Sequence, residues 1–233
     1  MKNKEILPVF NTYALQKSLF RHLSKEAIEQ LNFENSCNVY KKGEILYKEG
    51  NRLTGVYCII SGVIKVYKTG SEGRDQIIKF TKSGDIIGYR SVLSDEPACT
   101  SAKVLEDAVL CFVPTETLNH IIATNINFTK DLLLIACKEL DEANSFITDI
   151  AQKSVRERLA EVLILLKNEF GIDNTNTLKI VLTREELANI IGTATESVIR
   201  LLSEFKQDHL IDLEGRKIKL LNLQELIKIA NLF

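Results

Sequence analysis

The pattern of hydrophobic and polar positions changes character along the 233 residues of the chain. Between residues 37 and 113, short runs rich in Val, Ile and Tyr alternate with glycine-bearing turns, as in GVYCIISGVIKVYKTGSEG and SGDIIG. Closely and evenly spaced strands of this kind indicate an all-β barrel or sandwich. The preceding residues 1–36 predict two short amphipathic helices, whose clearest turn follows Ser24 and contains Ala27, Ile28 and Leu31.

Residues 125–150 predict one long helix, because this stretch contains neither glycine nor proline. Apolar or small residues recur in it at alternating steps of three and four, which is the spacing of a heptad seam. Two interpretations of the seam are open: the helix packs on its own barrel, or it pairs with the same helix of a second copy in a homodimer. The seam consists of Leu133, Ala136, Leu140, Ala143, Ile147 and Ile150.

A second amphipathic helix, SVRERLAEVLILLKNEF, begins on a different face after residues 151–153. It is followed by a predicted short strand LKIVL, a pair of helices, the hairpin HLIDLEGRKIKLLN and a last helix LQELIKIA. The length of the chain favours two compact units. The sequence therefore predicts an α+β protein with a strand-rich domain at 1–150, a domain at 151–233 and a hinge near residues 151–154.

The stretch TREELANIIGTATESVIRLLSEF has the spacing of a helix-turn-helix. Thr183 and Glu186 form a capping box that starts the first helix, and Gly192 gives the backbone freedom for a tight turn. Thr193 or Thr195 is expected to cap the second helix. The inward-facing residues of the two helices are expected to be Leu187, Ile190, Ile191, Val198, Leu201, Leu202 and Phe205.

The opposite face of the second helix carries side chains suited to a DNA major groove, notably Thr195, Glu196, Ile199 and Arg200. Arginine can donate two hydrogen bonds to guanine, glutamate can accept one from cytosine, and an apolar side chain can contact a thymine methyl group. The alternative is that Glu196 and Arg200 form only a surface ion pair.

Phosphate contacts are expected from small hydroxyl side chains and from the hairpin, which is basic where a winged helix-turn-helix would contact the DNA backbone. His209, just before the hairpin, is a further candidate. The expected phosphate-contacting residues are Thr193, Ser197, Arg216, Lys217 and Lys219.

Composition narrows the function without deciding it. Residues 1–150 hold 18 basic and 19 acidic side chains, and residues 151–233 hold 12 of each, so bulk charge does not announce a nucleic-acid partner. No apolar run approaches the roughly 20 residues that cross a bilayer, and the N-terminus lacks the apolar core of a signal peptide. We therefore expect a cytoplasmic protein without a membrane partner, in which most of the five scattered cysteines are buried thiols.

The whole layout from about residue 17 onward resembles the Crp/Fnr superfamily of bacterial transcription regulators. The resemblance rests on KKGEILYKEG, VYCIISGVIKVYK and SGDIIG in the strand-rich half, and on LTREELANIIGTATESVIRLLSEF with LIDLEGRKIKL near the end. It implies a β-roll of the jelly-roll type like a cyclic-nucleotide-binding domain, a dimerisation helix at about 125–150 and a C-terminal winged helix-turn-helix. It further implies a homodimer that binds a palindromic site on double-stranded DNA and contacts RNA polymerase.

Within this family a glutamate and an arginine four residues apart read the DNA, and Glu196 and Arg200 match them. The cyclic-AMP-responsive branch has an arginine just before the glutamate, where this chain has Thr195. Ile199 likewise departs from the residue of the oxygen-sensing branch that helps to read the first bases. A half-site with a G·C pair is therefore implied, but its outer bases are not.

The resemblance also locates a candidate effector pocket in the β-roll, with departures that argue against cyclic AMP. Cyclic-nucleotide binders have a glutamate for the ribose where this chain has Tyr89, and an arginine for the phosphate where it has Cys99 or Thr100. Arg90 is expected to point out of the pocket, because neighbouring side chains of an extended segment point in opposite directions. The candidate pocket residues are Gly88, Tyr89, Arg90, Thr100, Ser101 and Asn144, the last of which could instead set the register of a dimer.

No cofactor or metal is predicted. The oxygen-sensing branch binds an iron-sulfur cluster through closely spaced N-terminal cysteines, and this chain has none before Cys37. No catalytic constellation or phosphate-binding glycine loop indicates an enzyme. The alternative to a regulator is a ligand-binding or protein-interaction module that has lost DNA binding, which the neutral charge of residues 151–233 would allow.

Overall fold

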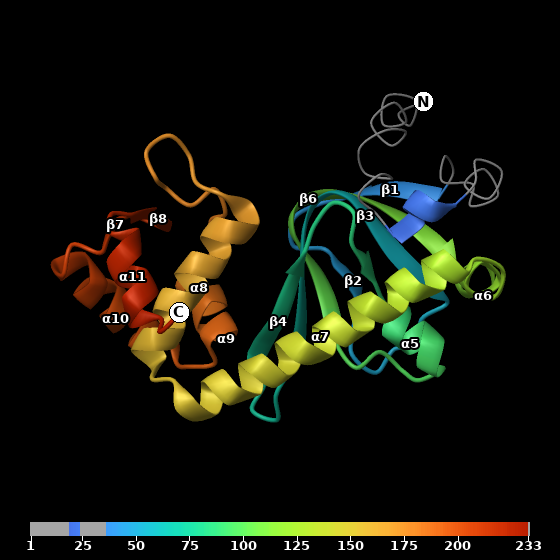
Figure 1. Ribbon diagram of the computed structural model, residues 1–233, viewed down its shortest axis with the longest axis horizontal. Helices are drawn as coiled ribbons and strands as arrows, with labels where there is room; N and C mark the ends of the chain where they lie inside the picture. The colour runs from blue at the N-terminus through green and yellow to red at the C-terminus, as the bar shows by residue number, and fades with distance from the viewer. Residues whose placement is uncertain (1–18, 24–35, 233) are drawn as a thin grey trace. The chain divides into compact units, whose positions relative to one another are not determined.

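A computed structural model describes residues 19–23 and 36–232 of the chain (Figure 1). The two amphipathic helices expected within residues 1–36 lie outside the described residues, apart from a short 3-10 helix, η2 (Leu19–His22). The chain divides into two compact units, Met1–Leu140 and Asp141–Phe233. This division falls inside the long helix α7 (Ile126–Gln152), ten residues before the boundary that the sequence pattern suggested.

The N-terminal unit is an antiparallel β-roll, as the spacing of its short apolar runs predicted. Its strands are ordered β1-β6-β3-β4, while β2 pairs with β6 and β5 pairs with β3. Two short helices interrupt or follow the strands: α5 (Tyr89–Ser94) and α6 (Thr115–Thr124). The strands are β1 (Cys37–Tyr40), β2 (Ile45–Tyr47), β3 (Gly55–Thr69), β4 (Asp75–Thr81), β5 (Ile86–Ile87) and β6 (Ser101–Pro114).

The two long strands β3 and β6 form the centre of the roll, and glycine allows their close approach. Gly62 has φ +89°, and a Cβ there would lie 2.5 Å from the carbonyl oxygen of Asp107 on β6. The pairing register of β3 and β6 shifts on both sides of this residue, between Ser61 and Val63. Only glycine tolerates both the left-handed backbone and the contact, so this position bends the roll.

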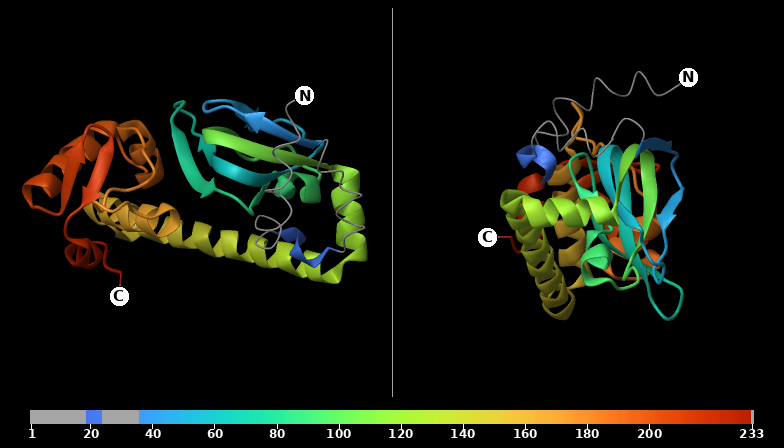
Figure 2. Two further views of the ribbon diagram at one scale, coloured as in Figure 1. Left: turned by 90° about the horizontal axis from the view of Figure 1, so that it is seen from above. Right: turned by 90° about the vertical axis from the view of Figure 1, so that its right-hand side faces the viewer.

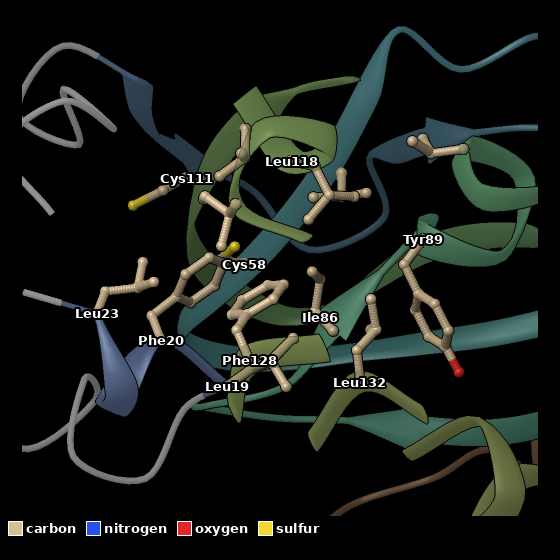
Figure 3. Packing of buried hydrophobic residues seen from close by; sticks show 14 of the residues in the cluster. Leu19, Phe20, Leu23, Cys58, Ile86, Tyr89, Cys111, Leu118, Phe128 and Leu132 are labelled. Carbon is tan, nitrogen blue, oxygen red and sulfur yellow. The ribbon is translucent and has the colours of Figure 1, made fainter. Parts of the chain in front are cut away.

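A hydrophobic cluster joins the roll to the first half of α7 (Figure 3). Phe128 and Leu132 of α7 are buried in it, and the Phe128 ring lies 5.4 Å from that of Phe20. The strand residues Val56, Cys111 and Val113 are fully buried in the same cluster. Figure 2 shows α6 at one end of the roll and the first half of α7 running along the side of the roll. Helix α7 therefore begins as a part of the N-terminal core.

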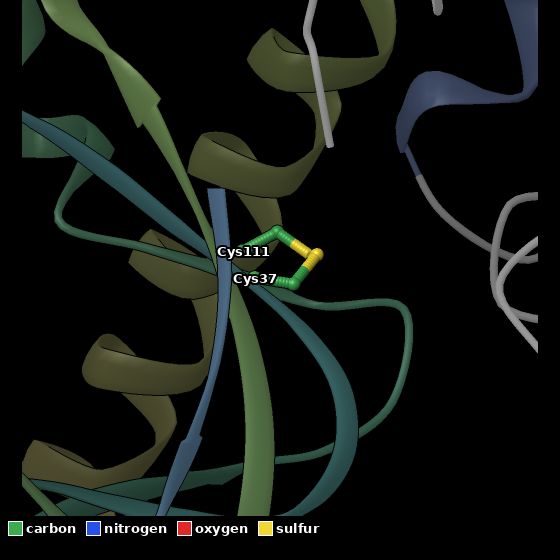
Figure 4. Close-up of a disulfide and its surroundings, with 2 residues drawn as sticks. All are labelled: Cys37 and Cys111. Carbon is green, nitrogen blue, oxygen red and sulfur yellow. A yellow bond between two sulfur atoms is a disulfide. The ribbon is translucent and has the colours of Figure 1, made fainter. Parts of the chain in front are cut away.

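The expectation that most cysteines are buried thiols is wrong. Cys37 and Cys111 form a disulfide between the directly paired positions of β1 and β6 (Figure 4). Cys99 and Cys137 are exposed, and only Cys58 is a buried free thiol, whose pKa is raised by burial. Sequence spacing could not show the disulfide, because its two cysteines are 74 residues apart and meet only through strand pairing.

The C-terminal unit contains helices α8 (Val155–Phe170), α9 (Arg184–Ile191), α10 (Thr195–Gln207) and α11 (Leu223–Ile229), and the hairpin of β7 (Ile211–Glu214) and β8 (Lys217–Leu220).

The predicted strand at residues 178–182 is wrong. Leu178, Ile180 and Leu182 alternate in burial with exposed neighbours, but the segment makes only isolated bridges, Ile172↔Leu178 and Thr177↔Lys219. The segment meets β8 only near its start, where the Leu178 amide donates to the carbonyl oxygen of Ile218 at 2.9 Å, so no continuous ladder forms.

The turn between α7 and α8 is held by a buried guanidinium. Arg158 of α8 donates from Nη1 to the carbonyl oxygens of Lys153 at 2.7 Å and Ile150 at 3.5 Å, and from Nε to that of Ile191 at 3.0 Å. These carbonyls lie at the C-terminal ends of α7 and α9, where helices leave acceptors unsatisfied. Ser154 adds a capping box with Glu157 at the start of α8. The turn is therefore a fixed corner within the C-terminal unit.

Loss of the disulfide is expected to destabilise the N-terminal unit selectively. Cys37→Ser should lower its free energy of unfolding by about 4 kcal/mol, the loop-closure contribution for a loop of 74 residues. All six tyrosines lie before residue 140 and the chain has no tryptophan, so urea unfolding followed by tyrosine fluorescence reports this unit alone. Cys99→Ser, which removes an exposed thiol, is the control and should be neutral; equal midpoints for both variants would contradict the prediction.

Removal of the Arg158 guanidinium is expected to destabilise the other unit. Arg158→Leu leaves buried carbonyl oxygens of Lys153 and Ile191 without donors, which should cost about 3 kcal/mol. The helical circular dichroism signal in urea should show an earlier transition while the tyrosine transition stays in place. Arg216→Leu in the exposed hairpin turn is the control and should change stability little. Unchanged helical unfolding of Arg158→Leu would show that this corner does not depend on the guanidinium.

Candidate nucleic-acid interface

The first half of the helix-turn-helix forms as its sequence predicts. The Thr183 hydroxyl accepts from the amide of Glu186 at 3.0 Å, while the Glu186 carboxylate accepts from the amide of Thr183 at 2.9 Å. Gly192 ends α9 in the left-handed conformation, with φ 73°. Its amide donates to the carbonyl oxygen of Ala188 at 2.9 Å, as does that of Thr193 at 3.1 Å. The capping box and the turn are therefore confirmed.

The predicted cap of the second helix is wrong. Ala194 is the N-cap of α10, in an extended conformation, and no side chain caps the helix. The carbonyl oxygen of Ala194 accepts from the amides of Ser197 and Val198 and so begins the helical ladder. Thr193 precedes the cap and Thr195 follows it, so neither hydroxyl is placed as the Ncap side chain. Both residues are half-buried, which leaves them partly accessible at the start of the helix.

Helix α10 has one buried and one exposed face, which agree with the predicted division. The side chains on its inner face, Val198, Leu201, Leu202 and Phe205, are at most 4% exposed. Glu196 and Arg200 are exposed, Ile199 is 50% exposed, and Ser197 is half-buried. The structure therefore brings the candidate base-reading residues together on one outer face.

The interpretation of Glu196 and Arg200 as a surface ion pair is wrong, because the two side chains do not pair. Nη1 of Arg200 donates to Oε1 of Glu204, one turn further along α10, at 2.6 Å. Within the described part of the chain, Glu196 has no ion pair or hydrogen bond from its side chain. Glu204 also pairs with Arg156 of α8, at 3.4 Å. Sequence reasoning missed Glu204 and Arg156, although the i,i+4 spacing of Arg200 and Glu204 was visible.

The hairpin after α10 presents its basic residues to solvent. Gly215 and Arg216 form a two-residue turn between β7 and β8, where Gly215 has φ 58°. Arg216 and Lys217 are exposed and Lys219 is half-buried, while His209 is exposed at the junction before β7.

The turn is tied to the helix-turn-helix by Arg184, whose Nη2 donates to the carbonyl oxygen of Gly215 at 2.8 Å. Arg184, at the start of α9, was missed at the sequence level, because only the fold brings it to the hairpin 31 residues later.

The candidate effector residues of the β-roll lie on α5 and at the start of β6. Gly88 is the N-cap of α5 with φ 86°, and Tyr89 is the first residue of that helix. Tyr89 is buried and Arg90 exposed. The outward direction of Arg90 was expected, but the reason given for it was wrong, since this segment is helical rather than extended.

Beside Tyr89, a pair of opposite charges joins the roll to α7. Lys79 of β4 pairs with Glu139 of α7, and both side chains are largely buried. The Tyr89 hydroxyl points away from the hydrophobic cluster (Figure 3) and has no hydrogen-bond partner of normal geometry among the described residues. Burial, followed by the Glu139 carboxylate, raises the pKa of Tyr89. Burial also raises the pKa of Tyr47 to about 12, against the opposing effect of its hydrogen bond with Thr100.

The other two candidate pocket residues are placed differently. Ser101 is buried at the start of β6, and its hydroxyl accepts from the amide of Glu49 at 2.9 Å. Asn144 is exposed on α7 and belongs to the C-terminal unit. Tyr89, Thr100 and Ser101 thus belong to the N-terminal unit, and Asn144 belongs to the C-terminal unit.

The heptad seam of α7 is open to solvent along most of its length. Leu133, Leu140 and Ile147 are 63%, 64% and 65% exposed, Ile150 is 41% exposed, and Ala143 is exposed. Ala136 is the exception, because it is half-buried against the hydrophobic cluster of the N-terminal unit.

Ile126, 66% exposed and seven residues before Leu133, extends the seam by one heptad that sequence reasoning did not include.

Residues 19–23 and 36–232 contain neither a candidate metal centre nor a candidate membrane-spanning helix. No group of three or more His, Cys, Asp or Glu side chains is arranged to hold a metal ion. No described helix is both long and apolar enough to cross a membrane.

Two family models match the two halves of the chain. The cyclic nucleotide-binding domain matches residues 37–125, and the Crp-like helix-turn-helix domain matches residues 157–229. These are the β-roll and the unit that carries α9, α10 and the hairpin.

The chain belongs to the Crp/Fnr family of regulators. Among curated relatives, this Crp/Fnr protein is 28% identical to the fumarate and nitrate reduction regulatory protein of Vibrio cholerae, over 82% of this chain and 76% of the relative. It is also 28% identical to the transcriptional activator protein Anr of Pseudomonas protegens, over 82% of this chain and 78% of the relative. It is therefore a DNA-binding transcription regulator and not an enzyme.

Solved structures share the fold of this Crp/Fnr protein. FixK2 from Bradyrhizobium japonicum superimposes with a TM-score of 0.73 at 24% identity, covering 83% of this chain and 96% of FixK2. A putative transcriptional regulator of the family from Eubacterium rectale gives a TM-score of 0.74 at 22% identity, covering 91% and 97%. The α+β fold with a β-roll, a long helix and a helix-turn-helix unit is thus that of the family.

Proposed function

We propose that this Crp/Fnr protein acts as a homodimer on a palindromic DNA site, which it reads with one α10 helix from each copy. The observation that carries the proposal is the outer face of α10, where Glu196, Ile199 and Arg200 are exposed while the inner face is buried. A helix held by one face is free to enter a major groove with the other.

In this arrangement Arg200 donates to a guanine and Glu196 accepts from a cytosine N4 amino group. Ile199 contacts a thymine methyl group, and Thr195 lies at the start of the helix beside them. Thr193, Ser197, Arg216 and Lys217 donate to phosphate oxygens and set the orientation of the helix without reading sequence.

Dimerisation through α7 is supported by its open seam. Four leucine or isoleucine residues at heptad spacing, Ile126, Leu133, Leu140 and Ile147, are each 63–66% exposed in a single chain. Burying one such side chain fully is worth about 1.5–3 kcal/mol, so a seam of this length favours association with a second copy. Two-fold symmetry would then place both α10 helices on successive turns of one DNA face.

The corner between α7 and α8 suggests how a signal would reach the DNA-binding unit. A hinge at residues 151–154 would have to break the Arg158 contacts and the pairs of Lys153 with Asp149 at 2.9 Å and Glu161 at 2.7 Å. We therefore place the flexible element of a two-state mechanism in α7 before Asp149. The corner would transmit a change in the packing of α7 to α8 and α9.

Cyclic AMP does not suit the charges of the β-roll. Lys79 is already paired with Glu139, the carboxylate that acts on Tyr89, and Arg90 is exposed. A phosphodiester would therefore enter without an uncompensated cation to pair with. The effector is accordingly unknown.

An iron-sulfur cluster is not part of the proposal. A cluster needs four thiolates, whereas two of the five cysteines form the Cys37–Cys111 disulfide and Cys58 is buried. Action on DNA implies a cytoplasmic location, and contact with RNA polymerase is proposed on the family resemblance alone.

The base-reading role is tested by selecting bound sequences from random duplexes. Wild type should enrich a palindrome, and Arg200→Ala should lose about 1–3 kcal/mol of discrimination at one G·C pair of each half-site. Arg74→Ala, which removes an exposed arginine of the β-roll, is the control and should keep the preference. Identical preferences in wild type and Arg200→Ala would refute the role of Arg200. Weak, sequence-independent binding by wild type would favour an interaction module.

The dimer is tested with two leucines of α7 that are equally exposed but lie on different faces. Leu140→Glu places a charge in the seam and should convert the dimer into a monomer with weakened DNA binding. Leu134 is 65% exposed but lies outside the seam, so Leu134→Glu should leave the dimer intact. Sedimentation equilibrium distinguishes the two outcomes. A monomeric wild type, or a dimer that persists in Leu140→Glu, would exclude this interface.

A further inference from the structure

Arg200 selects the less favourable of the two carboxylates within its reach along α10. Glu196 precedes it by four residues and Glu204 follows it by four, so both lie on its side of the helix. An acidic residue placed N-terminal to its basic partner suits the helix dipole, and the reverse order does not. The pair that forms is nevertheless Arg200 with Glu204, at 2.6 Å.

Arg156 explains this choice because it holds Glu204 from the neighbouring helix. Its Nη1 lies 3.4 Å from Oε2 of Glu204, and its Nη2 lies 2.7 Å from Oδ2 of Asp208. Its guanidinium also lies 4.7 Å from the ring centroid of Phe205, which is fully buried. A side chain fixed by two carboxylates and a ring has little freedom left, so the Glu204 carboxylate is oriented before Arg200 reaches it.

We propose that Glu204 is a positioning residue for DNA recognition, which aims the Arg200 guanidinium at its base. This inference rests on the proposed base-reading role of Arg200. One carboxylate oxygen of Glu204 binds Arg156 and the other binds Nη1 of Arg200. The Nε and Nη2 donors of Arg200 then form the edge that can donate to guanine O6 and N7. A long, 66% exposed side chain is thereby ordered before binding, which lowers the entropy cost of a specific contact.

The negative charge of Glu204 gives this role a distinctive signature. A carboxylate on the recognition helix repels phosphates, so its removal should strengthen binding to DNA of any sequence. Loss of positioning should at the same time weaken the preference of Arg200 for its base pair. A residue that merely stabilises the fold would weaken both kinds of binding together.

The test measures dissociation constants of the full-length protein by fluorescence anisotropy at fixed salt. The probes are the duplex that wild type selects, the same duplex with the Arg200-dependent G·C pair changed to A·T, and an unrelated duplex. Glu204→Ala should lower the G·C to A·T discrimination by about threefold to tenfold, the effect of one hydrogen bond, while binding the unrelated duplex more tightly. Glu225→Ala removes a carboxylate paired at 3.0 Å with Lys228 on α11, and should leave the discrimination unchanged.

A double-mutant cycle shows whether Glu204 acts through Arg200. In an Arg200→Ala background, adding Glu204→Ala should cause no further loss of discrimination. Arg156→Met, which frees Glu204 without touching α10, should reproduce part of the effect of Glu204→Ala.

Discrimination that stays within twofold of wild type in Glu204→Ala, or falls equally in the Arg200→Ala background, would overturn the positioning role. Neither outcome would affect the proposed function, because wild type would still select its sequence. The absence of any selected sequence in wild type would overturn both.

Discussion

A single buried guanidinium determines how the DNA-binding unit begins. Arg158 supplies donors to carbonyl oxygens at the ends of α7 and α9, which would otherwise be buried without partners. Because its donors diverge, the side chain can join two helix ends at once, which a lysine could not do with the same geometry. The direction of α8 relative to the end of α7, and the placement of α9 beside it, both follow from these contacts.

A second arginine, Arg156 of α8, has a comparable role beside α10. Four fully or nearly fully buried side chains fix the inner face of α10, so its outer face needs no structural role. Of the polar side chains on that outer face, Arg200 is held in place by a partner on the same helix. Arg156 lies over Phe205 at the rim of the core and extends order outward through Glu204 to Arg200. One arginine of α8 thus connects the packed core to the side chain proposed to read DNA.

The β-roll matches a cyclic nucleotide-binding domain, and it carries an ion pair where it meets α7. Lys79 and Glu139 neutralise one another between β4 and α7, next to a buried tyrosine hydroxyl. The charges connect a strand of the roll to the helix whose seam is open to solvent. A change in the roll therefore has a direct physical route to α7, whatever its cause.

The sequence by itself determined the strand-rich and helix-rich halves, the long helix between them, the capping box at Thr183, the turn at Gly192 and the two faces of α10. These features depend on interactions between residues a few positions apart, whose periodicity and turn chemistry are visible in one dimension. Only the tertiary structure decided the Cys37–Cys111 disulfide, the hold of Arg158 on two helix ends, the tie between Arg184 and the hairpin, and the choice of Glu204 as the partner of Arg200. Each of these joins or depends on residues that are distant in sequence, and which partner a side chain meets follows from the packing of whole elements rather than from local spacing. The expectations of a cap at Thr193 or Thr195 and of a strand at residues 178–182 failed for a related reason, because local propensity admitted more than one backbone conformation and the surrounding fold selected among them.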